Sequence, residues 1–135
     1  MIGILIVAHG AFGEALIHSA SHVIGKRPMR VRQVGVTVHD DPAAILPQAQ
    51  DLVKQLDEGA GVLVLTDIYG ATPGNIAQAL LEPGRVEGIS GVNLPMLIRA
   101  LTYRDRDLAT LVAKALSGGT EGVLHMTNDP CHAKR

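Results

Sequence analysis

The 135-residue sequence has few aromatic side chains and no excess of charge of either sign. Only three residues are Phe or Tyr and none is Trp, so a surface that stacks nucleic-acid bases is not expected. Twelve Lys and Arg residues are balanced by 13 Asp and Glu residues, which argues against a basic patch for a nucleic-acid backbone. Nucleic acid is therefore a poor candidate for a partner.

Cysteine and long apolar runs are also scarce. The one cysteine, Cys131, has no intrachain partner for a structural disulfide, which favours a reducing, cytoplasmic location. No apolar run approaches the roughly 20 residues of a membrane span, so direct membrane insertion is not expected. The apolar stretch 2–8 lacks a preceding basic segment and indicates a first strand rather than a signal peptide.

What the sequence does have is aliphatic residues in short blocks. Continuous apolar runs at 2–8 and 62–66 are typical of parallel strands covered on both faces. Alternation over 31–38 predicts a strand nearer the sheet edge, 86–93 is a fourth candidate, and 121–126 predicts a short last strand. A chain of this length fits one domain, which we place at residues 1–126, followed by a polar tail at 127–135.

Helical periodicity fills the gaps between these runs. The first helix begins near Phe12 and ends at Gly25. The second is expected after Pro47, and the third opens with Thr72 as N-cap and Pro73 in the first turn. Two more are expected at 95–102 and from 108 to the glycines at 118–119. The alternation predicts a doubly wound α/β fold with a mostly parallel sheet and helices on both faces.

Polar residues stand where three of the strands end. His9 and Asp67 directly follow the two continuous apolar runs, and Asn93 follows the fourth strand. In open parallel sheets, ligands bind beyond the carboxyl ends of the strands, and neighbouring strands lie about 4.8 Å apart. If the first and third strands are neighbours, His9 and Asp67 are within hydrogen-bonding reach. The carboxylate would then fix the imidazole tautomer and orient the other ring nitrogen as a nucleophile.

The loop after Asp67 leads into the N-terminus of the third helix. Free backbone N–H groups and the helix dipole favour an anion there, so Gly70, Ala71 and Thr72 are candidate phosphate-binding residues. Histidine, carboxylate and helix N-terminus together suggest a phosphohistidine carrier. Phe12, Tyr69 and Met96 are the expected apolar surround of this site.

Other candidate sites are weaker. His18 and His22 have a spacing that can bind a metal, but no third ligand is nearby in sequence, which favours a solvated helix face. Asn93 is expected to be a cap or turn residue. No dinucleotide fingerprint, phosphate-loop lysine motif or serine-hydrolase elbow occurs, and a metal site formed by His125, Cys131 and His132 is a poor candidate. No metal or cofactor is predicted.

Three stretches in this order resemble the IIA component of the mannose-type sugar phosphotransferase system (PTS). They are AHG at 8–10, TDIYGATP at 66–73 and GVNLPML at 91–97. The resemblance covers nearly the whole chain, from Ile2 to Met126. It implies a sheet of order 2-1-3-4 whose short final strand is exchanged across a homodimer. It also implies that His9 accepts a phosphoryl group from the carrier protein HPr and passes it to a IIB component, while Asp67 orients His9.

The resemblance has departures and competitors. Tyr69, Ala71 and Thr72 stand where family members often have Trp, Gly and Ser, so the hydroxyl group is kept while the loop differs. Many relatives continue into a IIB domain, and this sequence does not, which suggests a separate IIB acceptor or a regulatory role. A small tetrapyrrole metal chelatase and the IIA-like subunit of dihydroxyacetone kinase are the alternatives, because both also use a strand-end histidine.

Overall fold

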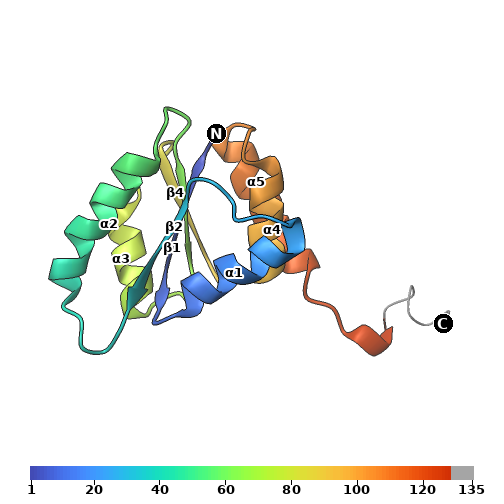
Figure 1. The fold of residues 1–135 in the computed structure, drawn as a ribbon, viewed down its shortest axis with the longest axis horizontal. Helices are drawn as coiled ribbons and strands as arrows, with labels where there is room; N and C mark the ends of the chain where they lie inside the picture. Colours follow the sequence, from blue (N-terminus) through green and yellow to red (C-terminus); the bar gives the residue numbers. More distant parts are fainter. Residues whose placement is uncertain (129–135) are drawn as a thin grey trace.

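A computed structural model of the protein describes residues 1–128. A sheet of four parallel strands forms its centre (Figure 1). The strands are β1 (Gly3–His9), β2 (Val31–Val36), β3 (Val62–Thr66) and β4 (Val86–Ser90), in the order β2-β1-β3-β4. The order implied by the family resemblance is confirmed, and β2 is an edge strand as its alternation predicts. The carboxyl ends of β1 and β3 are neighbours.

Five α-helices cover both faces of the sheet, which confirms the predicted doubly wound α/β class. Figure 1 shows α2 and α3 on one face and α1, α4 and α5 on the other. Their bounds are α1 Phe12–Ile24, α2 Pro42–Leu56, α3 Thr72–Leu80, α4 Leu94–Tyr103 and α5 Leu108–Glu121. Within the described residues, no helix is long and apolar enough to cross a membrane.

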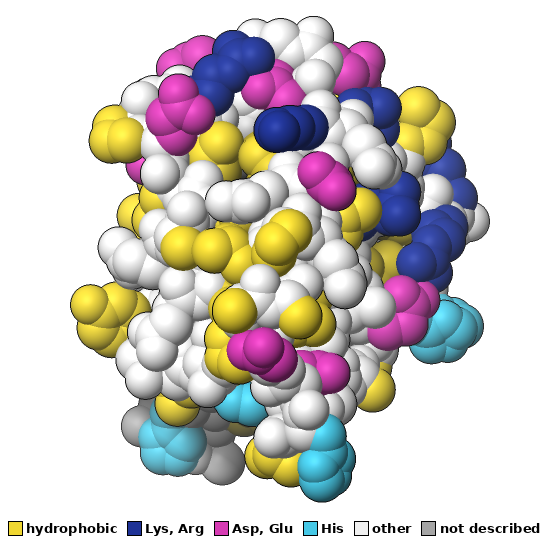
Figure 2. All heavy atoms as spheres, turned by 90° about the vertical axis from the view of Figure 1, so that its left-hand side faces the viewer, with side chains coloured by type: hydrophobic (Ala, Val, Ile, Leu, Met, Phe, Trp, Pro, Cys, Tyr) yellow, Lys and Arg dark blue, Asp and Glu magenta, His cyan; other side chains and the backbone are white. Residues whose placement is uncertain are grey.

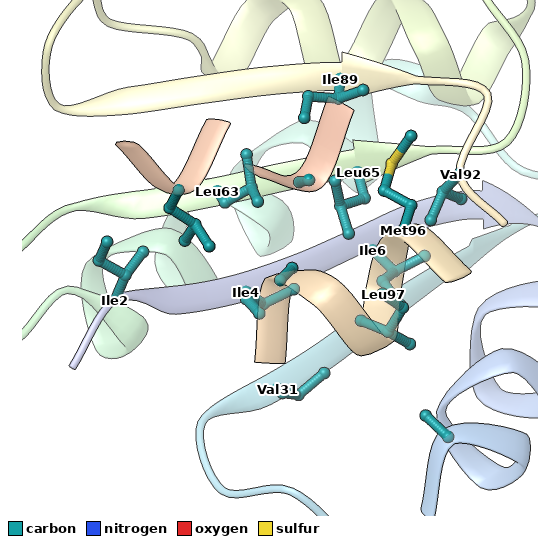
Figure 3. Packing of buried hydrophobic residues seen from close by; sticks show 14 of the residues in the cluster. Ile2, Ile4, Ile6, Val31, Leu63, Leu65, Ile89, Val92, Met96 and Leu97 are labelled. Atoms are coloured by element: carbon teal, nitrogen blue, oxygen red, sulfur yellow. The ribbon is translucent and has the colours of Figure 1, made fainter. Parts of the chain in front are cut away.

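Strand β1 supplies side chains to two separate cores. Ile4 and Ile6 pack toward α4 and α5 in the cluster drawn in Figure 3. Leu5 and Val7 point to the opposite face, toward α2 and α3. All four side chains are fully buried. Both faces of the strand are therefore removed from water, which explains its unbroken apolar sequence.

Helix α2 begins at Pro42, so the expectation of a start after Pro47 is wrong. The Asp41 side chain accepts a hydrogen bond from the N–H of Ala43 at 3.0 Å and caps the helix. Pro42 takes a first-turn position, where a missing N–H costs nothing. Pro47 lies inside the helix at an exposed position, and Ala43, whose carbonyl loses its helical partner, is exposed to water.

Helix α5 does not end at its two glycines as expected. It continues through Gly118 and Gly119 to Glu121. A Cβ atom on Gly118 would lie 2.6 Å from the Cβ of Arg99, and one on Gly119 would lie 2.7 Å from the Cε of Met96. Both neighbours belong to α4, so the glycines allow α4 and α5 to pack closely. This packing outweighs the low helix propensity of glycine.

The segment 121–126 is not a strand in the structure, contrary to the sequence prediction. Helix α5 ends at Glu121, residues 123–125 have no regular structure, and a 3-10 turn, η1, spans Met126–Asn128. A strand needs a partner for its backbone hydrogen bonds, whereas this segment leads away from the body of the molecule (Figure 1). Of the predicted polar tail, 129–135 lie outside the described residues.

Candidate functional site

His9 and Asp67 meet at the carboxyl end of the sheet. His9 is the last residue of β1, and Asp67 directly follows β3. The Nδ1 atom of His9 lies 2.8 Å from Oδ2 of Asp67, and the backbone N–H of His9 donates to the same oxygen at 3.0 Å. The contact predicted from the strand ends is thus present in the structure. The two hydrogen bonds fix the imidazole relative to its own backbone.

The carboxylate of Asp67 is held on its other oxygen as well. Oδ1 accepts hydrogen bonds from the N–H of Ile68 at 3.0 Å and from the hydroxyl of Thr66 at 3.5 Å. Partial burial raises the pKa of the Asp67 carboxyl, but the hydrogen bonds and charge of His9 lower it more, so this pKa lies below its ordinary value. Asp67 is therefore ionised at neutral pH and accepts a hydrogen from His9.

This arrangement leaves one imidazole nitrogen open. Because an ionised Asp67 carries no proton, Nδ1 of His9 must donate the hydrogen of the 2.8 Å contact. In the neutral ring, Nε2 then keeps its lone pair. The His9 side chain is 54% exposed and that of Asp67 is 14% exposed. The pair therefore presents a nucleophilic nitrogen to solvent while its supporting carboxylate is covered.

Two glycines shape the turn that follows His9. Gly10 has a positive φ of 52°, and its N–H donates to the carbonyl of Val36 at 2.9 Å. A Cβ on Gly35 of β2 would lie only 2.2 Å from the carbonyl oxygen of Gly10. Gly35 therefore allows the turn to cross β2, a role that sequence reasoning missed. The sequence feature that could have indicated this role is a glycine inside a predicted strand, which often marks a close approach of another backbone segment.

The predicted phosphate-binding residues lie at the start of α3. Gly70 has a positive φ of 85°, Ala71 is the N-cap, and Thr72 is the first helical residue. The expectation that Thr72 is the N-cap is therefore wrong, because the helix begins with the N–H of Asn75 bonded to the carbonyl of Ala71 at 2.9 Å. The Thr72 side chain is exposed, and its hydroxyl has no hydrogen-bond partner among residues 1–128. Its phosphate role stays a prediction.

Asn93 and Met96 do not belong to the exposed site. The side-chain oxygen of Asn93 caps α4 by accepting from the N–H of Met96 at 2.9 Å, and its amide donates to the carbonyl of Gly119 at 3.1 Å. Asn93 is thus a structural cap. Met96 is 4% exposed and part of the core, so its expected place around the site is wrong. Phe12 and Tyr69 are 40% and 79% exposed.

The other histidines are distributed over the surface. His18, His22 and His39 are exposed, while Cys131 and His132 lie outside the described residues. Figure 2 shows histidine side chains mainly toward the lower end of the face formed by α2 and α3, where the strands end, whereas Lys and Arg gather above them. Residues 1–128 contain no cluster of three His, Cys, Asp or Glu residues that could hold a metal.

Fold and site together define a doubly wound α/β protein with a carboxylate-held histidine where the strand order reverses. The family model described as the PTS system fructose IIA component matches residues 3–116. The chain therefore belongs to the mannose and fructose family of IIA components of the phosphotransferase system.

Individual relatives agree with this assignment. The PTS system mannose-specific EIIAB component of Escherichia coli K12 is 32% identical over 132 residues, 96% of this chain and 41% of that protein. The PTS system fructose-specific EIIA component of Bacillus subtilis is 31% identical over 78% of this chain and 72% of its own length. The crystal structure of the phosphotransferase system component EIIA from Streptococcus agalactiae superposes with a TM-score of 0.85 at 28% identity, covering 96% of this chain and 100% of that one. The chain thus spans about two fifths of the E. coli protein.

Proposed function

We propose that this protein is a phosphoryl carrier of the phosphotransferase system that is phosphorylated on His9. The donor would be phospho-HPr and the acceptor a IIB component, in the cytoplasm, with the carrier activity contained in residues 1–126. The observation that carries the proposal is the 2.8 Å contact between Nδ1 of His9 and Asp67, which leaves Nε2 as the open nucleophile. The family assignment favours this function over the tetrapyrrole chelatase and the dihydroxyacetone kinase subunit.

In the proposed reaction, the Nε2 lone pair of His9 attacks the phosphorus of the phosphohistidine on HPr. The new N–P bond forms as the old one breaks, and the HPr imidazole leaves with the electron pair. The phosphorylated His9 ring carries positive charge, and the Asp67 carboxylate on Nδ1–H stabilises it. Transfer to the IIB component repeats the same exchange with His9 as the leaving group. Such transfer depends mainly on placement of the two reacting groups.

Gly70, Ala71 and Thr72 would hold the phosphoryl oxygens during transfer. The first backbone N–H groups of α3 have no acceptor within the helix, and Pro73 lacks an N–H altogether. The exposed hydroxyl of Thr72 supplies a further donor. Helix N-termini favour anions through these donors and through the helix dipole. Hydrogen bonds from this loop would offset the negative charge of the phosphoryl group.

Exposed apolar side chains near His9 suit a brief protein contact. Phe12 begins α1, three residues after His9, and is 40% exposed. Ile68 and Tyr69 directly follow Asp67 and are 55% and 79% exposed. A carrier must release both donor and acceptor, so a small, transient interface is appropriate. We propose that HPr and the IIB component dock in turn on these residues. The same phosphorylated surface could serve sugar transport or a regulatory partner.

We also propose that the protein is a homodimer, in which segment 121–126 of each chain adds a strand to the sheet of the other. Val123, Leu124 and Met126 are 74%, 66% and 72% exposed in the single chain. β2 and β4 are the edge strands of the described sheet, and their outer backbone groups could pair with another strand, except at Val86 of β4, which already bonds to Glu82. A second chain would cover these apolar side chains and supply the strand partner that the segment lacks.

A phosphorylation assay tests the proposed function. The full chain is incubated with phosphoenolpyruvate, the PTS kinase enzyme I and HPr, and acid-labile phosphate is measured on the wild type and on His9→Ala. The wild type should take up one phosphoryl group per chain, and the mutant should take up none. Adding a IIB component should then remove the label. An unlabelled wild type would refute the carrier function, and a labelled His9→Ala protein would refute the site.

A further inference from the structure

A second pair of histidines makes direct contact on the first helix. His18 and His22 lie one turn apart on α1, and their Nε2 atoms are 3.2 Å from each other. The rings are nearly perpendicular, at 84°, with centroids 4.7 Å apart. Both residues are exposed. The structure thus shows that the two rings meet through the same atom, Nε2, which the spacing in sequence alone could not establish.

The distance between these nitrogens suits a shared metal ion. With the Zn–N bonds of about 2.0–2.1 Å found in proteins, nitrogens 3.2 Å apart subtend an angle of about 103° at the metal, close to tetrahedral. We propose that His18 and His22 form a chelating site for a divalent transition-metal ion such as Zn²⁺, bound through both Nε2 atoms. Water would complete the coordination, because residues 1–128 contain no third ligand beside the pair.

The charges around His18 and His22 affect the affinity expected for a metal ion. The two histidines line a shallow hollow with Ser21, Lys26 and Arg27. Arg27 donates to Glu14 at 3.0 Å, so its charge is largely compensated, whereas the charge of Lys26 opposes a cation. With two protein ligands rather than the four of a structural zinc site, the site should exchange its metal readily.

The chemistry of the two imidazole nitrogens determines which metal ions the proposed site should prefer. Neutral imidazole nitrogens suit Zn²⁺, Ni²⁺ and Cu²⁺, whereas Mg²⁺ and Ca²⁺ prefer oxygen ligands. In the metal-free protein the two Nε2 atoms can share only one proton between them. A bound metal would replace that proton and engage both lone pairs.

The test is a Zn²⁺ titration of the full chain, followed by NMR of the histidine ring signals. Signals of His18 and His22 should shift together and saturate together, and Mg²⁺ should not move them. His18→Gln and His22→Gln should each weaken Zn²⁺ binding at the remaining ring by about tenfold or more, because a preorganised second ligand acts at high effective concentration. The matched control is His39→Gln, an exposed histidine outside the pair, which should bind Zn²⁺ at His18 and His22 as the wild type does.

Two results would overturn the proposal. One is the absence of a response of the two ring signals to Zn²⁺ while other histidines respond. The other is unchanged affinity at the remaining ring after either substitution. Because His18 and His22 take no part in the proposed phosphoryl transfer, both variants should accept phosphate on His9 at the wild-type rate. Failure of the metal-site proposal would therefore leave the carrier proposal unaffected, and the reverse also holds.

Discussion

Among single residues, Asp67 has two roles at the candidate site. It holds the His9 ring at 2.8 Å and the His9 backbone N–H at 3.0 Å with one oxygen. In the proposed reaction, its charge would also stabilise the positive imidazole formed by phosphorylation of His9. Its side chain sits at a strand end and is 14% exposed, outside the two apolar clusters of the core. Loss of this carboxylate should therefore harm transfer more than folding.

We predict that Asp67→Ala lowers the rate of phosphoryl transfer by about a hundredfold, the effect of misplacing a reacting group by about an ångström. Asp67→Asn should fall between the wild type and Asp67→Ala, because the single amide oxygen can keep the two hydrogen bonds to His9 but not the charge. Rapid-quench kinetics with phospho-HPr measure the rates, and circular dichroism checks the fold. Equal rates for Asp67→Ala and the wild type would remove Asp67 from the mechanism.

The pairing of His9 with Asp67 could be predicted because parallel strands end together at one edge of the sheet. The cap expected for Asn93, which follows β4, is also confirmed, because its side-chain oxygen accepts from the N–H of Met96 in the first turn of α4. What could not be predicted is the bond from its amide to the carbonyl of Gly119 in α5, or the burial of Met96. Met96 lies on α4 close in sequence to the same strand end, but its side chain turns into the core. Side-chain direction depends on helix packing that the sequence pattern does not reveal.

At the scale of elements, β2 controls the turn after His9. Gly35 faces the carbonyl oxygen of Gly10, and any larger side chain there would push the turn away. Gly88 of β4 is also a glycine inside a strand, but a Cβ there would meet the flexible end of the Leu81 side chain at 2.8 Å. A methyl group at position 35 would therefore displace backbone, whereas one at position 88 would displace only a side chain.

We predict that Gly35→Ala destabilises the protein by about 1–3 kcal/mol, the usual range for overpacking, and also slows phosphorylation of His9. Gly88→Ala is the matched control, which should cost less stability and leave the phosphorylation rate unchanged. Urea unfolding and the phosphorylation assay give the two measurements. A Gly35→Ala protein with wild-type transfer would show that the turn adapts without displacing His9.

Element boundaries were less predictable than element order. The order of strands and helices follows from apolar runs and periodicity, but three boundaries predicted from proline, glycine and threonine were wrong. Pro47 is tolerated within α2 at an exposed position, and Gly118 and Gly119 are kept in α5 by close contact with α4. Thr72 resembles an N-cap but is the first helical residue. At the two glycines, packing against α4 outweighs the local preference.

At the scale of the whole molecule, one buried cation joins parts of the chain that are far apart in sequence. Arg104 is 5% exposed and donates to the carbonyls of Ile2, Met29 and Arg30. It thereby ties the end of α4 to the beginnings of β1 and β2. Burial lowers the pKa of this guanidinium. No pattern in the sequence distinguished Arg104 from the other arginines, since its role exists only once the fold has formed.

Assembly is the other property of the whole molecule that can be tested. If segment 121–126 is exchanged between chains, Leu124→Asp should shift the protein from dimer to monomer, because a charge in an apolar contact is costly. The control is Ala44→Asp, at an exposed residue of α2, which covers a face of the sheet rather than its edge and should stay dimeric. Analytical ultracentrifugation measures both. A monomeric wild type, or a dimeric Leu124→Asp protein, would contradict the proposed exchange.

In the proposed carrier, Asp67 occupies Nδ1 of His9 and leaves Nε2 to accept the phosphoryl group. The most direct measurement is NMR of protein labelled with ¹⁵N-histidine and phosphorylated by phosphoenolpyruvate, enzyme I and HPr, in which the ¹⁵N–³¹P coupling identifies the bonded nitrogen. We expect coupling to Nε2 of His9. Coupling to Nδ1 of His9, or to a nitrogen of any other histidine, would contradict it.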